Sequence, residues 1–120
     1  MAAVFVEKSE ENWNIFEQLR SSNFFDAAAS RLYYSLFQAV KAFALKTGTM
    51  TEDDSLNVHV KAKDIVRQNC SSSIYHAFCD ALEMRVRADY ESRRVLASEF
   101  SQHFICQLDM LRRQFVKLAS

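Results

Sequence analysis

Arginine, aspartate and tyrosine side chains gather between residues 85 and 90 of this 120-residue chain. Arg85 precedes Asp89 by four residues, a spacing that puts both side chains on one face of a helix. Arg85 also continues an apolar stripe, the face that a helix normally buries. Two interpretations stay open: a structural ion pair at the rim of the core, or a cationic site where Arg85 or Arg87 faces a phosphate.

A second polar group lies earlier in the chain, within a long apolar segment. Arg31, Tyr34, Ser35 and Gln38 form a thin polar stripe there. On composition alone we expect this stripe to be a solvated strip on a mostly buried helix. Tyr33 and Tyr34 are expected in the core or at an interface, with their hydroxyls bonded to a partner.

Metal and nucleophile chemistry has little support in the sequence. His76, Cys79 and Asp80 lie within one helical turn, but no second pair of ligands accompanies them, so we predict no metal and no cofactor. With a single glycine, the chain has neither a GxSxG elbow nor a glycine-rich phosphate loop. The chain has three cysteines: Cys70, Cys79 and Cys106. We expect them to be small buried side chains, in a protein of the reducing cytoplasm.

Hydrophobic periodicity predicts five helical segments. They cover residues 9–21, 24–46, about 58–69, from the serines at 71–73 to about 90, and 93–118. Ser9, Asn23 and Ser92 are plausible N-caps for three of them, and Gly48 is a stop signal for the second. The 24–46 segment is apolar nearly all round, which is typical of a helix at the centre of a bundle or at a subunit interface.

These elements predict an all-α protein, an up-and-down bundle of four main helices plus a short fifth helix, in a single domain spanning residues 1–120. The chain contains no proline, and fifteen basic residues balance fifteen acidic ones. The net charge therefore gives no sign of a nucleic-acid or membrane partner. We see no signal peptide and no membrane span, and we expect a cytoplasmic protein with no membrane partner.

Two stretches resemble a known family when they are taken together. AAASRLYYSLFQAVKAFAL (27–45) and RVRADYE (85–91) are similar to the motifs A-x-R-x-YY-x-x-F-x-A and R-x-x-A-D-Y of the HEPN superfamily, the higher eukaryotes and prokaryotes nucleotide-binding domains. The match spans about residues 10–118. The resemblance implies a helical bundle that is commonly dimeric. Many relatives are encoded beside a minimal nucleotidyltransferase and bind it, as toxin–antitoxin or defence pairs.

Other members of that family are metal-independent ribonucleases with the signature R-x(4–6)-H, whose arginine and histidine meet across a dimer cleft. No arginine of this chain is followed by a histidine at that distance, and His59 and His103 have no partner nearby in the sequence. Cleavage of RNA without a metal needs an acid and a base that work near neutral pH, which is the role of histidine. Asp89 could act as a base, but Tyr90 is a poor acid.

The leading hypothesis is a weakly catalytic or non-catalytic HEPN-like module. It would form a homodimer with a cleft for a nucleotide, an RNA or a partner protein, within a toxin–antitoxin or defence pair. The predicted ligand-binding residues are Arg31, Tyr34, Arg85, Arg87, Asp89 and Tyr90. One alternative is a metal-independent toxin ribonuclease in which the catalytic residues are Arg85, Asp89 and Tyr90. A third hypothesis is a purely structural interaction bundle.

Overall fold

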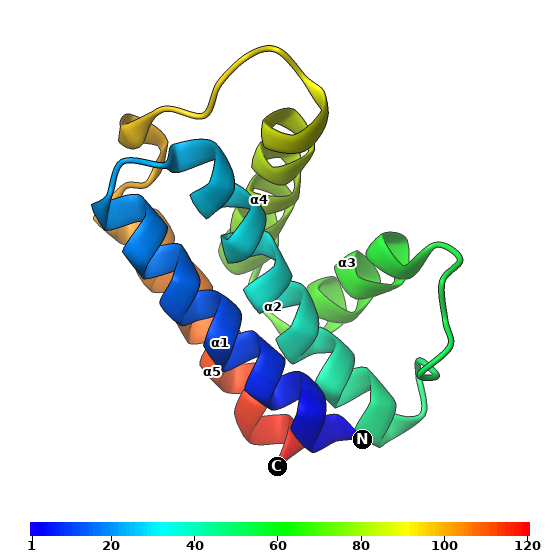
Figure 1. Ribbon diagram of the computed structural model, residues 1–120. Coiled ribbons are helices and arrows are strands. Elements are labelled where there is room, and N and C mark those ends of the chain that lie inside the picture. The colour runs from blue at the N-terminus through cyan, green and yellow to red at the C-terminus, as the bar shows by residue number, and fades with distance from the viewer.

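The computed structural model describes all 120 residues as five α-helices without a β-strand. The helices are α1 (Ala2–Ser21), α2 (Phe25–Thr47), α3 (Val58–Asn69), α4 (Ser72–Tyr90) and α5 (Gln102–Ala119), with one 3-10 turn, η1 (Ala97–Glu99) (Figure 1). The predicted all-α class is confirmed, with four long helices and the short α3. None of these helices has both the length and the apolar character that a membrane span requires.

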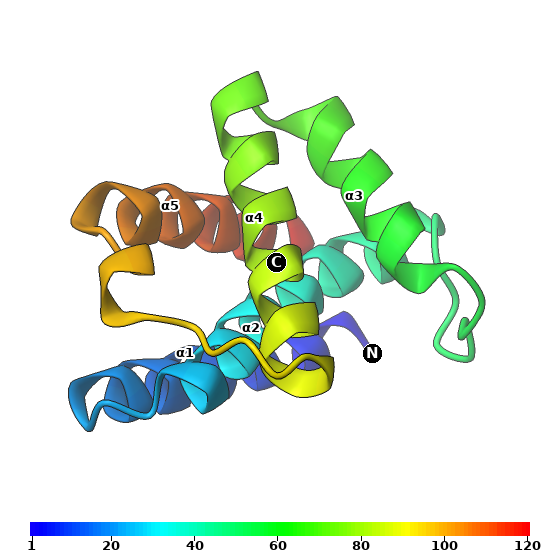
Figure 2. The same ribbon diagram turned by 90° about the horizontal axis from the view of Figure 1, so that it is seen from above.

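Helix α2 occupies the centre of the bundle and packs against each of the other four helices. Figure 1 shows α1 and α5 running beside α2, and Figure 2 shows the α3–α4 hairpin crossing it steeply. The fully buried side chains of α2 include Leu32, Tyr33, Leu36 and Val40. Of the two locations expected for this apolar helix, the centre of the bundle is confirmed. The apolar faces of α2 are covered within one chain, so they give no separate reason for a dimer.

A pair of buried serines joins α1 to α2. The Ser9 hydroxyl donates to the Ser35 carbonyl at 2.7 Å, and the Ser35 hydroxyl donates to the Ser9 carbonyl at 2.8 Å. The prediction that Ser9 caps a helix was wrong, because α1 begins at Ala2 and Ser9 lies in its interior. The solvated strip predicted around Ser35 was also wrong at this residue, since Ser35 is fully buried against α1.

The ends of α2 are set by two residues in the left-handed region. Asn23 has a φ of 66°, and the helix begins at Phe25, so Asn23 is part of the turn and not the predicted N-cap. Gly48 has a φ of 78° and ends α2, as predicted.

The predicted start of the last helix was wrong by nine residues. Ser101 is the N-cap of α5 and accepts a hydrogen bond from the Phe104 amide, whereas Ser92 caps nothing. Asp26 of α2 explains the difference: its carboxylate accepts the Val95 amide at 2.8 Å and pairs with Arg94 at 3.2 Å. Because Asp26 holds these residues, the segment between α4 and α5 crosses the start of α2 without forming an α-helix.

Candidate functional site

The end of α4 brings Arg85, Asp89 and Tyr90 beside Tyr34 of α2, and we call these four residues the Arg85 cluster. Arg85 Nη2 donates to Tyr34 Oη at 2.6 Å, and Arg85 Nε lies 3.1 Å from Asp89 Oδ2. The guanidinium lies 5.2 Å from the centroid of each of the two tyrosine rings, within the range of a cation–π contact. The predicted pairing of Arg85 with Asp89 is therefore present, and two of the predicted ligand-binding tyrosines border the same guanidinium.

Arg85 keeps hydrogen-bonding capacity that the protein does not use. Its side chain is only 13% exposed, yet Nη1 has no partner within the protein and is not enclosed, so solvent reaches it. The buried Nε–H lies close to Asp89 but is not directed at an acceptor. Asp89 is the one carboxylate paired with Arg85, and its side chain is 32% exposed. One carboxylate thus faces the guanidinium, and Nη1 remains a free donor for a ligand.

Arg112 shows how the same fold holds an arginine with a structural role. Its side chain is more deeply buried than that of Arg85, and it donates to Glu10 at 2.7 Å and Asp109 at 2.8 Å. The guanidinium also lies over the Trp13 ring. Two carboxylates therefore neutralise Arg112, and the one on Glu10 fastens α5 to α1, whereas Arg85 has one carboxylate partner and an unpaired nitrogen that solvent reaches.

Arg87 is not part of the Arg85 cluster. Two residues along an α-helix correspond to a rotation of about 200°, so the side chains of Arg85 and Arg87 leave α4 on nearly opposite sides. Arg87 is buried and pairs with Glu99 of η1 and, at 3.7 Å, with Glu83. The structure places this predicted phosphate contact in an ion-pair network that holds η1 to α4.

Arg31 also points away from the cluster. Its exposed side chain donates through Nη1 to Asn12 Oδ1 of α1 at 3.0 Å. Of the six predicted ligand-binding residues, the structure brings four together and places Arg31 and Arg87 elsewhere.

Helix α3 contributes a residue that the sequence did not connect to this region. His59 Nδ1 lies 2.7 Å from Tyr33 Oη, and the neighbouring Tyr34 binds Arg85. Burial, followed by the positive charge of Arg85, lowers the pKa of His59. No local pattern indicated this contact, because 26 residues separate Tyr33 from His59.

No protein-family model matches the chain. A curated relative from Methanocaldococcus jannaschii, named "Putative toxin MJ0142", is 29% identical over 101 residues, which cover 83% of this chain and 69% of the relative. An alignment of that length within 120 residues necessarily includes the segment from Tyr33 to Tyr90. The similarity therefore extends over the region that contains the Arg85 cluster and His59.

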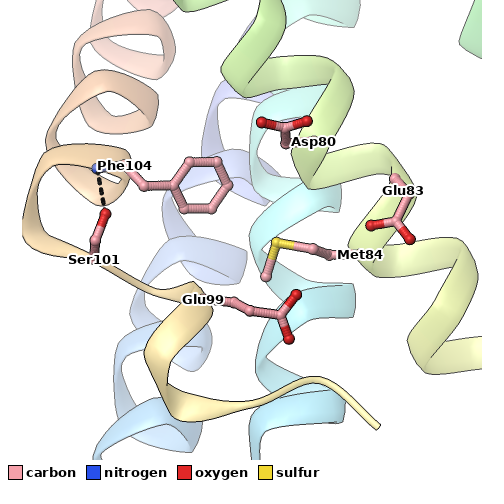
Figure 3. Close-up of a pocket in the computed structure, with 6 residues that line it drawn as sticks. All are labelled: Asp80, Glu83, Met84, Glu99, Ser101 and Phe104. Carbon is pink, nitrogen blue, oxygen red and sulfur yellow. Dashed lines mark hydrogen bonds between the residues drawn. The ribbon is translucent and has the colours of Figure 1, made fainter. Parts of the chain in front are cut away.

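The largest hollow of the surface lies away from the Arg85 cluster. It has a volume of about 390 Å³ and is lined by Asp80, Glu83, Met84, Glu99, Ser101 and Phe104 (Figure 3). Three of these residues carry carboxylates, and two of them pair with Arg87. Such a lining repels a phosphate, so this hollow does not suit a nucleotide or RNA.

No three histidine, cysteine, aspartate or glutamate side chains are grouped in a way that could hold a metal ion. All three cysteines are free thiols; Cys106 is exposed and Cys70 and Cys79 are only half-buried, so the expectation that all three are buried was wrong. The groups that the Arg85 cluster presents to a ligand are a guanidinium cation and the two tyrosine rings beside it. A guanidinium contacts phosphate oxygens, and a tyrosine ring stacks on a base.

Proposed function

We propose that this protein is the toxin-type member of a toxin–antitoxin or defence pair and that it binds single-stranded RNA at the Arg85 cluster. The observation that carries the proposal is the unused, solvent-accessible Nη1 of a largely buried arginine with a single carboxylate partner. The name of the relative from Methanocaldococcus jannaschii supports the toxin-type role. The resemblance to the HEPN superfamily supports a nucleotide or RNA as ligand.

Tyr90 supplies the second element of such a site. Its side chain is largely exposed at the end of α4, and its ring borders the Arg85 guanidinium. An exposed aromatic ring beside a cation suits an unpaired base with its adjacent phosphate, and each stacked base contributes about 1–3 kcal/mol to binding. Tyr34 accepts a hydrogen bond from Arg85 and fixes the direction of the guanidinium.

Cleavage of the bound RNA is expected to be weak or absent. Asp89, the candidate base, already contacts Arg85 and accepts a long hydrogen bond of 3.4 Å from Ser30. Tyr90, the candidate acid, lies with its hydroxyl 3.4 Å from Arg85 Nη2, and a phenol is a poor proton donor at neutral pH. The ribonuclease that uses Arg85, Asp89 and Tyr90 is the alternative function.

The binding test compares two arginines of matched geometry. Arg85 and Arg113 each place Nε 3.1 Å from the Oδ2 of an aspartate four residues away on the same helix, but Arg113 is exposed and lies outside the cluster. Affinity for a labelled single-stranded RNA should fall about 10- to 100-fold in Arg85→Ala, the value of one charge-assisted hydrogen bond. It should change little in Arg113→Ala. Equal effects of the two substitutions would show that the cluster is not the RNA site.

The same RNA, incubated with EDTA, separates the two functions. The proposal expects the strand to remain intact. Robust cutting that disappears in Arg85→Ala and in Asp89→Asn would instead establish the toxin ribonuclease.

The proposal includes partners. The resemblance implies a homodimer, and it implies a minimal nucleotidyltransferase as the protein partner. Co-expression with a nucleotidyltransferase encoded beside this gene, followed by size-exclusion chromatography, tests the second. Separate elution of the two proteins at micromolar concentration would remove that partner from the proposal.

A further inference from the structure

His59 is the second residue of α3 and is half-buried against α2. Its Nδ1 lies 2.7 Å from Tyr33 Oη, and its ring centroid lies 5.0 Å from that of Phe37. Its other nitrogen, Nε2, makes no hydrogen bond within the protein and is not enclosed, so solvent reaches it. One side of the imidazole is therefore held by α2, and the other side is free.

Tyr33 decides which nitrogen of His59 carries the proton. Tyr33 is fully buried, and His59 is the sole hydrogen-bond partner of its hydroxyl. Burial raises the pKa of Tyr33, so the phenol keeps its proton. A buried hydroxyl proton needs an acceptor, and Nδ1 is the available one. The neutral imidazole then carries its own proton on Nε2, where it serves as a hydrogen-bond donor.

Two consecutive tyrosines link His59 to the Arg85 cluster. Tyr33 binds His59, while Tyr34 accepts a hydrogen bond from Arg85, and the two ring centroids are 5.7 Å apart. We propose that His59 is a second binding group of the Arg85 site and donates from Nε2 to a phosphate of the RNA strand that Arg85 holds. This inference rests on the proposed RNA-binding function and adds a residue to it.

Binding through His59 makes the affinity depend on pH. The titratable groups around His59 and Tyr33 are Tyr34 of α2 and Cys79 and Arg85 of α4, and the charge that acts on the imidazole is that of Arg85. Burial and this charge lower the pKa of His59, so the free protein holds it neutral at pH 7. A phosphate beside Nε2 favours the imidazolium and raises the same pKa in the complex. The added proton is on Nδ1, which then donates to the Tyr33 oxygen instead of accepting from it. RNA binding should therefore strengthen as the pH falls from 8 to 5, because the complex then takes up a proton.

The probe is a labelled oligouridylate, since neither uracil nor a phosphodiester titrates between about pH 5 and 8. His59→Gln keeps a donor close to the position of Nε2 but cannot take up a proton, whereas His59→Phe removes the donor. We expect His59→Phe to lose about tenfold in affinity at pH 8, as for one hydrogen bond to a charged group, and to lose more at pH 5, because it also lacks the strengthening of the wild type. We expect His59→Gln to bind within about threefold of the wild type at pH 8 and to lose the strengthening at low pH.

His103 is the matched control, because it is the exposed second residue of α5 and lies outside the site. His103→Gln should keep both the affinity and the pH profile of the wild type. Melting curves identify a His59→Phe variant that fails to fold, in which case the pH profile of His59→Gln decides.

The outcomes distinguish the role of His59 from the proposed RNA-binding function on which it rests. If Arg85→Ala weakens binding while both His59 variants match the wild type at every pH, His59 does not touch the ligand and the RNA site stands without it. If the wild type does not bind oligouridylate, or if Arg85→Ala binds as tightly as the wild type, the proposed function fails and the role of His59 fails with it.

Discussion

Removal of Arg85 should mainly weaken RNA binding, and removal of Arg112 should mainly weaken the fold. Both arginines are inserted between helices and lie over aromatic rings, but they differ in their carboxylate partners. Arg112 donates to two carboxylates, whereas Arg85 pairs with one and keeps an unpaired nitrogen that solvent reaches. We expect Arg112→Ala to destabilise the fold strongly, and Arg85→Ala to impair RNA binding at a modest cost in stability.

The magnitudes follow from what each substitution leaves behind. Arg112→Ala breaks a network whose guanidinium is almost fully buried and frees Glu10, which has no other partner. Breaking a buried pair costs about 3–5 kcal/mol, and the partial exposure of the carboxylates reduces this to about 2–4 kcal/mol. Arg85→Ala loses two cation–π contacts, each of about 0.5–1 kcal/mol, while Asp89 remains partly hydrated. We expect a loss of about 1–2 kcal/mol.

Thermal unfolding and RNA binding, measured on the same preparations, check this contrast. One kcal/mol corresponds to about 4 °C in Tm for a chain of this size, so Arg112→Ala should melt about 8–16 °C lower and Arg85→Ala about 4–8 °C lower. An Arg85/Asp89 double-mutant cycle, scored for both observables, isolates the pair itself. If Arg85→Ala lowers Tm as much as Arg112→Ala and leaves RNA affinity unchanged, Arg85 is a structural residue and the reasoning is refuted.

Three further predictions concern the fold and its assembly. Although burial raises the pKa of Glu99, the Leu96 amide and Arg87 lower it below its ordinary value. The stability that this lowered pKa contributes is present above about pH 4.5 and is lost as the pH falls further. In an acid titration followed by circular dichroism, Glu99→Gln should therefore show a flatter stability profile than the wild type. Gly48→Ala should lower the free energy of unfolding in urea titrations by about 1 kcal/mol, because Gly48 has a φ of 78°, which a side chain disfavours. The loss stays this small because no neighbouring atom would contact the methyl group. The proposed homodimer is checked by sedimentation velocity at micromolar concentration, where a monomer alone would contradict it.

The helix interiors could be predicted from the sequence, but the first and last helix starts could not. Apolar spacing identified the core helix α2 and the short α3 because burial on a helix face is a local periodic signal. The start of α5 depends on Asp26, whose carboxylate accepts a hydrogen bond from the Val95 amide, 69 residues away. Ser9 is a residue type that commonly caps helices, but its hydroxyl donates to the Ser35 carbonyl in another helix. In both places a distant partner outweighs the local preference for a helix end.

The candidate site likewise contains residues whose placement follows from local spacing and residues whose partners are distant in the sequence. The pairing of Arg85 with Asp89 follows from a four-residue spacing, and the structure contains it. The resemblance singled out Tyr34, and the structure places it against Arg85. Helical geometry alone argues against grouping Arg87 with Arg85, since a two-residue step points the two side chains in nearly opposite directions. Arg31 could not be assigned in this way, because its partner lies in α1.

His59 shows why a missing local signature is a weak guide to the chemistry of a site. The R-x(4–6)-H pattern describes a histidine on the same helix as its arginine, whereas here α3 brings a histidine to the neighbourhood of Arg85 from 26 residues earlier. Its hydrogen bond matters more than its presence. With Nδ1 accepting from Tyr33, the neutral ring carries its proton on Nε2 and has no free lone pair with which to remove one from a ribose hydroxyl. A histidine in this tautomer is suited to bind a phosphate, and it is a poor general base. The expectation of binding with little cleavage therefore follows from the geometry of His59 as well as from the sequence.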